Sequence, residues 1–166
     1  AIVNNKIPGI AEKVIDAITT NETMWFRDKK PWIIFEEILM PKYINILRTG
    51  QKSKIRIWSA ASSTGQEAYS TAICIDNYLH NEKITDISLS QFEIVATDIS
   101  KIVIDIAKSG RYNGITIKRG LDTEIRDRYF TKCNGIWELD NRIKNAVTFK
   151  QFNLQKDFFH LGNFDL

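Results

Sequence analysis

Residues 55–70, IRIWSAASSTGQEAYS, decide the fold of this chain. Apolar and polar side chains alternate from Ile55 to Ala60, which predicts a β-strand. Small residues then form a turn that ends at Gly65, and from Gln66 to about His80 the apolar residues return at helical spacing. The segment therefore predicts a strand, a tight turn and a helix in immediate succession.

A second unit of the same kind follows along the chain. Residues 92–97, FEIVAT, predict a strand that ends at Asp98. Residues 100–109 have helical spacing, and Gly110 is a natural helix terminator. Strands that alternate with helices in this way are typical of a parallel sheet covered by helices. We therefore expect an α/β fold.

The first 50 residues read as a helical lead-in. After a loop at residues 1–9, helical spacing predicts one helix over 10–18. A second helical stretch is expected to open at Pro31, with Asp28 as its cap, and to be kinked or broken at Pro41. The residues expected on its core face are Trp32, Phe35, Leu39, Tyr43, Ile46 and Leu47.

Beyond residue 120 the pattern changes. Residues 121–130 predict a short helix, and 135–139 and 146–152 read as two strands joined by a polar segment. We expect a small antiparallel insertion at 121–147, after which the main sheet resumes. Residues 164–166 read as the start of another strand.

Composition narrows the class of protein. The net charge of +3 is spread over basic residues that stand beside acidic ones, whereas nucleic-acid binders concentrate a basic face. The two cysteines, Cys74 and Cys133, lie far apart with no zinc-type spacing. No apolar run approaches the length of a membrane span. We expect a reduced cytoplasmic protein with no nucleic-acid partner, no membrane insertion and no metal.

The first turn carries the features of a nucleotide site. Small residues let a ligand approach the backbone, and Asp98 at the end of the second strand is placed to accept from ribose hydroxyls. The turn has a single glycine, Gly65, and Asp98 follows 33 residues later, farther than the roughly 20 of the dinucleotide fingerprint. Glu67 beside the turn suits a cationic ligand better than a phosphate. The pattern favours S-adenosylmethionine over NAD or ATP.

Five segments occur in the order found in one known family. They are TNETMWFRD at 20–28, IWSAASSTGQEAYS at 57–70, ATDI at 96–99, AKSGRY at 107–112 and FKQFNL at 149–154. Together they resemble the CheR-type chemotaxis receptor O-methyltransferases. The resemblance implies a Rossmann-like S-adenosylmethionine-dependent methyltransferase sheet with a small antiparallel β insertion.

The resemblance also implies roles for individual residues. Glu67 would meet the methionine end of the donor, Asp98 its ribose and Asn153 its adenine. Arg27 would lie near the transferring methyl group or the acceptor carboxylate, as the catalytic candidate. The implied donor-binding residues are Asn21, Thr23, Arg27, Ala60, Glu67, Asp98, Ile99, Asn153 and Leu154. Without the resemblance, several of these would be read as solvated, helix-dipole or turn residues.

The implied reaction is methyl transfer to glutamate side chains in the cytoplasmic helical region of chemoreceptors, giving methyl esters. A glutamate is ionised at neutral pH, with a reference pKa of about 4.3, and needs no general base. Two alternatives stay open: a related carboxyl or small-molecule methyltransferase, and a non-catalytic module that binds S-adenosylmethionine.

The sequence departs from the family pattern in several places. Trp25 stands where phenylalanine is usual, and Ala68 replaces a proline. The glycine-rich loop of the family is reduced here to residues 131–135, which argues against tethering by a receptor's C-terminal pentapeptide. We expect residues 1–50 to form a lead-in and 51–166 a methyltransferase domain, and we expect sequence of the family to be missing on both sides.

Overall fold

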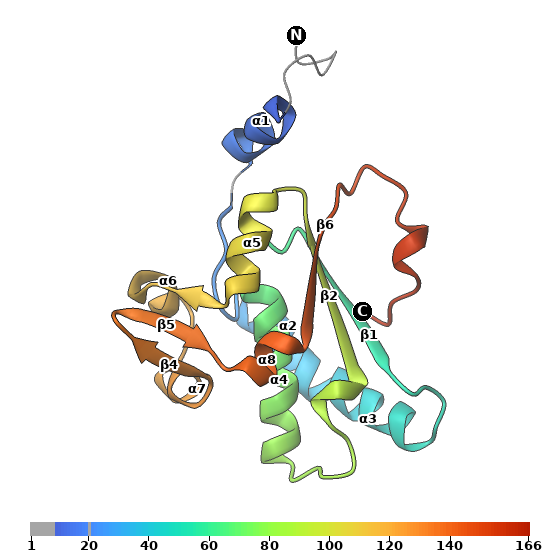
Figure 1. The fold of residues 1–166 in the computed structure, drawn as a ribbon. Helices are drawn as coiled ribbons and strands as arrows, with labels where there is room; N and C mark the ends of the chain where they lie inside the picture. The colour runs from blue at the N-terminus through green and yellow to red at the C-terminus, as the bar shows by residue number, and fades with distance from the viewer. Residues whose placement is uncertain (1–8, 20) are drawn as a thin grey trace.

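The structure, a computed structural model, describes residues 9–19 and 21–166. The loop expected at the start of the chain and Thr20 of the lead-in motif lie outside the described residues. At the centre is a parallel sheet of three strands, in the order β1 (Ile55–Ala60), β2 (Phe92–Asp98) and β6 (Val147–Gln151) (Figure 1). Ile57 pairs with Ile94 and Ala96 with Phe149, so all three strands end at the same edge.

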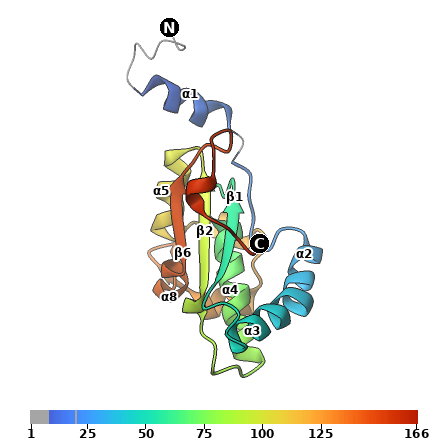
Figure 2. The same cartoon turned by 90° about the vertical axis from the view of Figure 1, so that its right-hand side faces the viewer.

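The sheet packs its buried face against helices. α4 (Gln66–Asn81) and α5 (Lys101–Ser109) contact both β2 and β6, and α8 (Asn141–Asn145) contacts β6 (Figure 2). Alternation along β1 directs Ile55 and Ile57 into this core. The strand–turn–helix units predicted at 55–80 and 92–109 are confirmed, and Gly110 closes α5 in the left-handed conformation, as expected.

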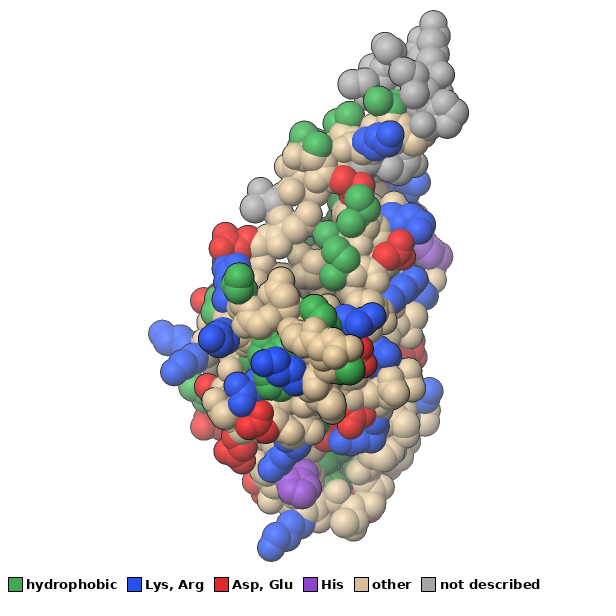
Figure 3. All heavy atoms as spheres, turned by 60° about the vertical axis from the view of Figure 1, so that its left-hand side comes forward, with side chains coloured by type: hydrophobic (Ala, Val, Ile, Leu, Met, Phe, Trp, Pro, Cys, Tyr) green, Lys and Arg blue, Asp and Glu red, His purple; other side chains and the backbone are tan. Residues whose placement is uncertain are grey.

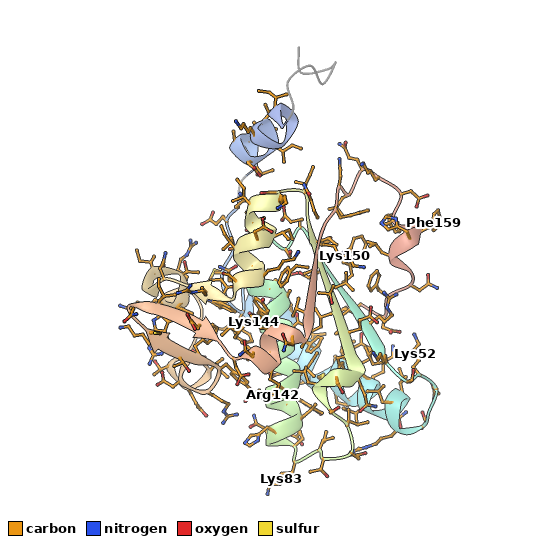
Figure 4. The ribbon with its side chains drawn as sticks, viewed as in Figure 1. Lys52, Lys83, Arg142, Lys144, Lys150 and Phe159 are labelled. Carbon is orange, nitrogen blue, oxygen red and sulfur yellow. The ribbon has the colours of Figure 1, made fainter. Side chains whose placement is uncertain are left out.

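The opposite face of the sheet is covered by a segment rich in aromatic residues. Trp58 of β1 contacts the rings of Phe152, Phe158 and Phe164, which follow β6. This segment includes the 3-10 turn η3 (Phe159–Leu161). The ring of Phe159 is 84% exposed (Figure 4).

The lead-in contains α1 (Ile10–Ile18) and one continuous helical stretch. Figure 1 shows α1 standing away from the sheet, and its Asp16 accepts a hydrogen bond of 2.5 Å from Ser100, the N-cap of α5. The stretch consists of α2 (Lys29–Ile34), the π-helix η1 (Phe35–Leu39) and α3 (Met40–Arg48).

Two expectations for this stretch need correction. Of the kink or break expected at Pro41, the break does not occur: the helical stretch continues through Pro41 and changes to π-type hydrogen bonding in the preceding turn. Proline has no N–H and its ring crowds the carbonyl four residues earlier, and a wider turn relieves both problems. The helix begins at Lys29 rather than Pro31, and the Asp28 side chain makes no capping hydrogen bond.

An antiparallel insertion lies beside the main sheet. Its strands are β3 (Arg111–Tyr112), β5 (Ile136–Leu139) and β4 (Phe130–Cys133), in that order across the sheet. The helices α6 (Gly114–Lys118) and α7 (Thr123–Tyr129) precede the β4–β5 hairpin. The hairpin turn is Asn134-Gly135, with both φ angles positive, 50° and 81°, as a two-residue turn between twisted strands requires.

The pairing expected for 146–152 is wrong. This segment forms β6, parallel to β2 in the main sheet, and does not pair with 135–139. The reason is the short helix α8, which was not expected and which reverses the chain between β5 and β6. Arg142 of α8 donates hydrogen bonds to Asp76 of α4, and these bonds hold α8 against α4 (Figure 4). The helix expected over 121–130 is present as α7.

Residues 164–166 run along the free edge of β1 without forming a regular strand. The N–H of Asp165 donates to the carbonyl of Arg56 at 2.7 Å, and the N–H of Trp58 donates to the carbonyl of Leu166 at 2.9 Å. The connection between α4 and β2 includes the 3-10 turn η2 (Leu89–Gln91), closed by a capping box.

Trp25 anchors the lead-in to the insertion. Its ring is fully buried and packs edge-on against Tyr112 and Phe130, with centroid distances of 5.0 and 5.2 Å. The backbone N–H of Trp25 donates to the carbonyl of Arg119. Gly120 is required here, because a Cβ at this position would lie 2.1 Å from the carbonyl oxygen of Trp25. The lead-in motif is thereby held over the end of the sheet.

On the face drawn in Figure 3, no large basic patch stands out. Figure 3 shows basic and acidic side chains interspersed over the visible face. Within residues 9–19 and 21–166, no helix is long and apolar enough to cross a membrane.

Candidate functional site

A cavity of about 360 Å³ opens at the carboxyl ends of β1 and β2. Four segments form its walls: the lead-in, the turn after β1, the residues at the end of β2 and the segment after β6. Its lining consists of Thr19, Asn21, Glu22, Thr23, Met24, Arg27, Trp32, Ala61, Ser62, Ser63, Glu67, Asp98, Ile99, Phe152, Asn153 and Leu154. This is the edge of a parallel sheet at which ligands of open α/β folds bind.

The turn after β1 is tightly constrained. The N–H of Ser62 donates to the carbonyl of Thr97 and the N–H of Gly65 donates to the carbonyl of Ser62, both at 2.9 Å. Ala61 and Ser63 have positive φ angles of 53° and 49°, which is uncommon for residues with side chains. The backbone of the turn is thus fixed close against the end of β2.

Tyr112 of the insertion also holds this turn. Its hydroxyl donates to the carbonyl of Thr64 at 2.9 Å. Burial raises the pKa of Tyr112 well above its ordinary value, so the hydroxyl remains protonated and available as a donor. The antiparallel insertion therefore supports the wall of the cavity.

Asp98 is the buried acid of the site. One carboxylate oxygen accepts from the N–H of Ser63 at 2.8 Å, and the other accepts from the N–H of Ser100 at 3.0 Å. These bonds fix the orientation of the carboxylate, which is only 7% exposed. An ionised carboxylate has about four acceptor positions. Two therefore remain for hydroxyl groups of a ligand.

Glu67 is the more open acid of the site. It lies in the first turn of α4, where a negative charge is stabilised by the helix dipole. The buried hydroxyl of Ser59 donates to its Oε1 at 2.8 Å. With Glu67 at the helix N-terminus, the cavity suits a cationic group and disfavours a phosphate.

Arg27 lies at the outer part of the cavity, on the lead-in. Its carbonyl accepts from the indole N–H of Trp32 at 2.9 Å. Its guanidinium is largely exposed, and its nearest carboxylate, that of Asp28, is 3.9 Å away. The arginine is therefore available to a second, anionic reactant that approaches from solvent.

The structure brings together eight of the nine predicted donor-binding residues. Asn21, Thr23, Arg27, Glu67, Asp98, Ile99, Asn153 and Leu154 all line the cavity. Ala60, the last residue of β1, does not line it, whereas the following Ala61 does.

Sequence reasoning missed several lining residues. Trp32 was expected in the core but is half-buried at the cavity wall. Ser62, Ser63 and Phe152 lie inside the recognised motifs at 57–70 and 149–154. Their position next to predicted site residues could have identified them as lining residues. The described residues contain no cluster of histidine, cysteine or carboxylate side chains able to hold a metal.

Together, the parallel sheet, the acid after β2 and the acid at the start of α4 define a nucleoside-binding α/β domain with a preference for a cationic ligand. Residues 21–166 match the family described as CheR methyltransferase, SAM binding domain. The chain belongs to this family, and its cofactor is S-adenosylmethionine. The size of the cavity and the carboxylates of Glu67 and Asp98 fit such a ligand.

The chain is similar to several curated chemotaxis methyltransferases. It is 38% identical over 159 residues to "Chemotaxis protein methyltransferase Cher2" of Pseudomonas putida, covering 95% of this chain and 56% of the relative. It is 39% identical over 163 residues to "Chemotaxis protein methyltransferase 1" of Pseudomonas aeruginosa, with the same coverage. It is 35% identical over 166 residues to "Chemotaxis protein methyltransferase 1" of Vibrio cholerae, covering 99% of this chain and 58% of the relative.

The chain thus spans a little over half the length of the curated relatives it matches. Among solved structures, a DszA carbon methyltransferase aligns over 82% of this chain and 26% of its own, with a TM-score of 0.37 and 16% identity. That likeness is too weak to support an inference.

Proposed function

We propose that this chain is the donor-binding part of an enzyme that methylates glutamate side chains of chemoreceptors, forming glutamate methyl esters. The observation that carries the proposal is a cavity lined by residues of four of the five motifs, those at 20–28, 57–70, 96–99 and 149–154. The names of the relatives, which are chemotaxis protein methyltransferases, support the same reaction.

The donor is proposed to lie across the carboxyl edge of the sheet. Asp98 would accept from the ribose hydroxyls with its two remaining acceptor positions. Glu67, held by Ser59, would face the ammonium group of the methionine part. Ile99, Asn153 and Leu154 would enclose the adenine, and Asn21 and Thr23 would close the site from the lead-in.

Arg27 is proposed to orient the acceptor. The sulfonium of the donor supplies the activated methyl group. The exposed guanidinium of Arg27 would pair with the acceptor carboxylate and direct one of its oxygens toward the methyl group. An ionised carboxylate needs no base, so alignment is the main contribution of the protein. The cavity contains no arrangement of nucleophile and base that would suggest another route.

We further propose residues 1–50 as a lead-in and 51–166 as part of a methyltransferase domain, with 121–147 as its insertion. The partner would be the cytoplasmic helical region of a chemoreceptor, and the compartment the cytoplasm. The two-residue turn Asn134-Gly135 leaves no extended loop in the β4–β5 hairpin, and this supports the expectation that the protein does not use a pentapeptide tether.

Calorimetric titration with S-adenosylhomocysteine tests the donor site. We expect micromolar binding by the wild type and at least a tenfold loss in Asp98→Ala. Asp105→Ala is the matched control, because Asp105 is an exposed acid of α5 that pairs with Lys101 away from the cavity. Circular dichroism must show that both variants are folded. Equal binding by all three proteins would refute the assignment of Asp98.

Transfer of labelled methyl groups to a chemoreceptor fragment tests the acceptor, using the whole protein. We expect base-labile label on the receptor, as a methyl ester requires. Arg27→Ala should lower the rate of transfer much more than the affinity for S-adenosylhomocysteine. Donor binding without any receptor labelling would refute the proposed acceptor and leave the donor site standing.

A further inference from the structure

One buried hydroxyl in the wall of the cavity has no hydrogen-bond partner. Ser62 is only 3% exposed, and its Oγ makes no hydrogen bond to any described residue. Ser62 also lines the cavity. Buried polar groups in native proteins are nearly always paired, and an unpaired group calls for an explanation.

The neighbouring hydroxyls are all paired. Ser59 donates to Glu67, Ser63 donates to the carbonyl of Asn21, and Thr64 donates to the side chain of Gln66. The end of β1 and the turn therefore place these three hydroxyls in internal bonds, whereas the hydroxyl of Ser62 has no partner among the described residues.

The backbone around Ser62 cannot easily shift to find a partner. Its N–H is bonded to Thr97 and its carbonyl to Gly65. The residues on either side, Ala61 and Ser63, have positive φ angles that fix the turn. The backbone thus offers no route to an internal partner, and Ser62 is a lining residue of the cavity in which a ligand would lie.

The remaining unpaired atoms fit this interpretation. The other buried side-chain polar atoms without a partner among the described residues are Thr19 Oγ1 and Trp25 Nε1. Trp25 lies in the core between aromatic rings. Thr19 lines the same cavity and borders residue 20, which lies outside the described chain.

We infer that the Ser62 hydroxyl is a further ligand-binding group of the site and hydrogen bonds to a polar atom of the S-adenosyl ligand. The inference rests on the proposed donor site. The carboxylates of Glu67 and Asp98 can only accept hydrogen bonds while ionised, whereas the Ser62 hydroxyl can also donate. Ser62 therefore adds a neutral donor to the site, and this donor has no competing partner before the ligand arrives.

Substitution of an unpaired hydroxyl affects stability and ligand binding differently from substitution of a hydroxyl that is hydrogen bonded within the protein. Removing it should weaken ligand binding and leave the ligand-free protein as stable as before, or more stable. The matched control is Ser63→Ala, because that neighbouring hydroxyl is already bonded within the ligand-free protein. Its removal should lower the unfolding temperature measured without ligand.

The experiment measures thermal unfolding without ligand and calorimetric binding of S-adenosylhomocysteine for wild type, Ser62→Ala, Ser62→Cys and Ser63→Ala. For Ser62→Ala we expect an unfolding temperature equal to or above that of the wild type, and a Kd raised about threefold to tenfold, the usual range for one neutral hydrogen bond. Ser62→Cys keeps a weak donor, and its Kd should lie between the two.

An unchanged Kd in Ser62→Ala would overturn the inference and leave the donor site intact. A loss of unfolding temperature in Ser62→Ala as large as that in Ser63→Ala would also overturn it, because the hydroxyl would then have an internal partner. Absence of binding by the wild type would refute the donor site itself and this inference with it.

Discussion

Replacing Gly65 with alanine should destabilise the protein and weaken its binding of the donor. Gly65 has a φ of 92°, in the left-handed region, which costs a residue with a side chain about 1–2 kcal/mol. An added Cβ would lie 3.0 Å from the Cβ of Ala107 and 3.0 Å from the ring of Phe149. Overpacking of this kind costs about 1–3 kcal/mol.

The two costs together amount to about 2–5 kcal/mol of unfolding free energy. For a chain of this size, each kcal/mol lowers Tm by about 2–4 °C. We therefore expect Tm to fall by about 4–20 °C, measured by differential scanning calorimetry. Because Gly65 also caps the N-terminus of α4, the affinity for S-adenosylhomocysteine should fall as well.

Gly135→Ala is the matched control for the packing part of this cost. Gly135 has a φ of 81°, but nothing lies within 4 Å of an added Cβ. Only the conformational cost of about 1–2 kcal/mol applies there, and ligand affinity should not change. Equal losses of Tm in the two variants would refute the claim that Gly65 is required by close packing between α5 and β6.

Three further predictions concern single side chains. Ser59→Ala removes the hydrogen bond that orients the exposed acid of the cavity, and should raise the Kd for S-adenosylhomocysteine about threefold to tenfold by calorimetry; an unchanged Kd would show that this carboxylate does not meet the ligand. The hydrogen-bonded guanidinium of Arg48 lowers the pKa of Asp86 to about 2, so NMR titration of this carboxyl should return toward about 4 in Arg48→Ala. Because the pKa is lowered by folding, this pair contributes stability above pH ~4, and the contribution is lost as the pH falls through about 2. Burial raises the pKa of the Cys74 thiol, whereas Cys133 is exposed, so a thiol reagent should label Cys133 at once and Cys74 only on unfolding; equally fast labelling would contradict the buried position of Cys74.

The sequence by itself determined the two strand–turn–helix units and showed that each carries an acidic residue, Glu67 or Asp98, next to its turn. Alternation over 55–60 and helical spacing after Gly65 are local patterns. Such patterns predict a strand or a helix even when the neighbouring strand in the sheet is not known. Once both strands are taken as parallel, Glu67 and Asp98 must lie at the same edge. The motif order added Arg27 and Asn153 to this edge, and the cavity contains all four residues.

Only the tertiary structure decided which strands pair and which side chains lack a partner. Residues 147–151 have the composition of a strand, but nothing local distinguishes pairing with β2 from pairing with β5; the turn made by α8 and the burial of Val147 and Phe149 decide it. The unpaired hydroxyl of Ser62 is likewise invisible in the sequence, because its neighbours are also serine and threonine. Strand pairing and hydrogen-bond satisfaction depend on groups that are distant in the chain, and the sequence specifies those contacts only through the folded structure as a whole.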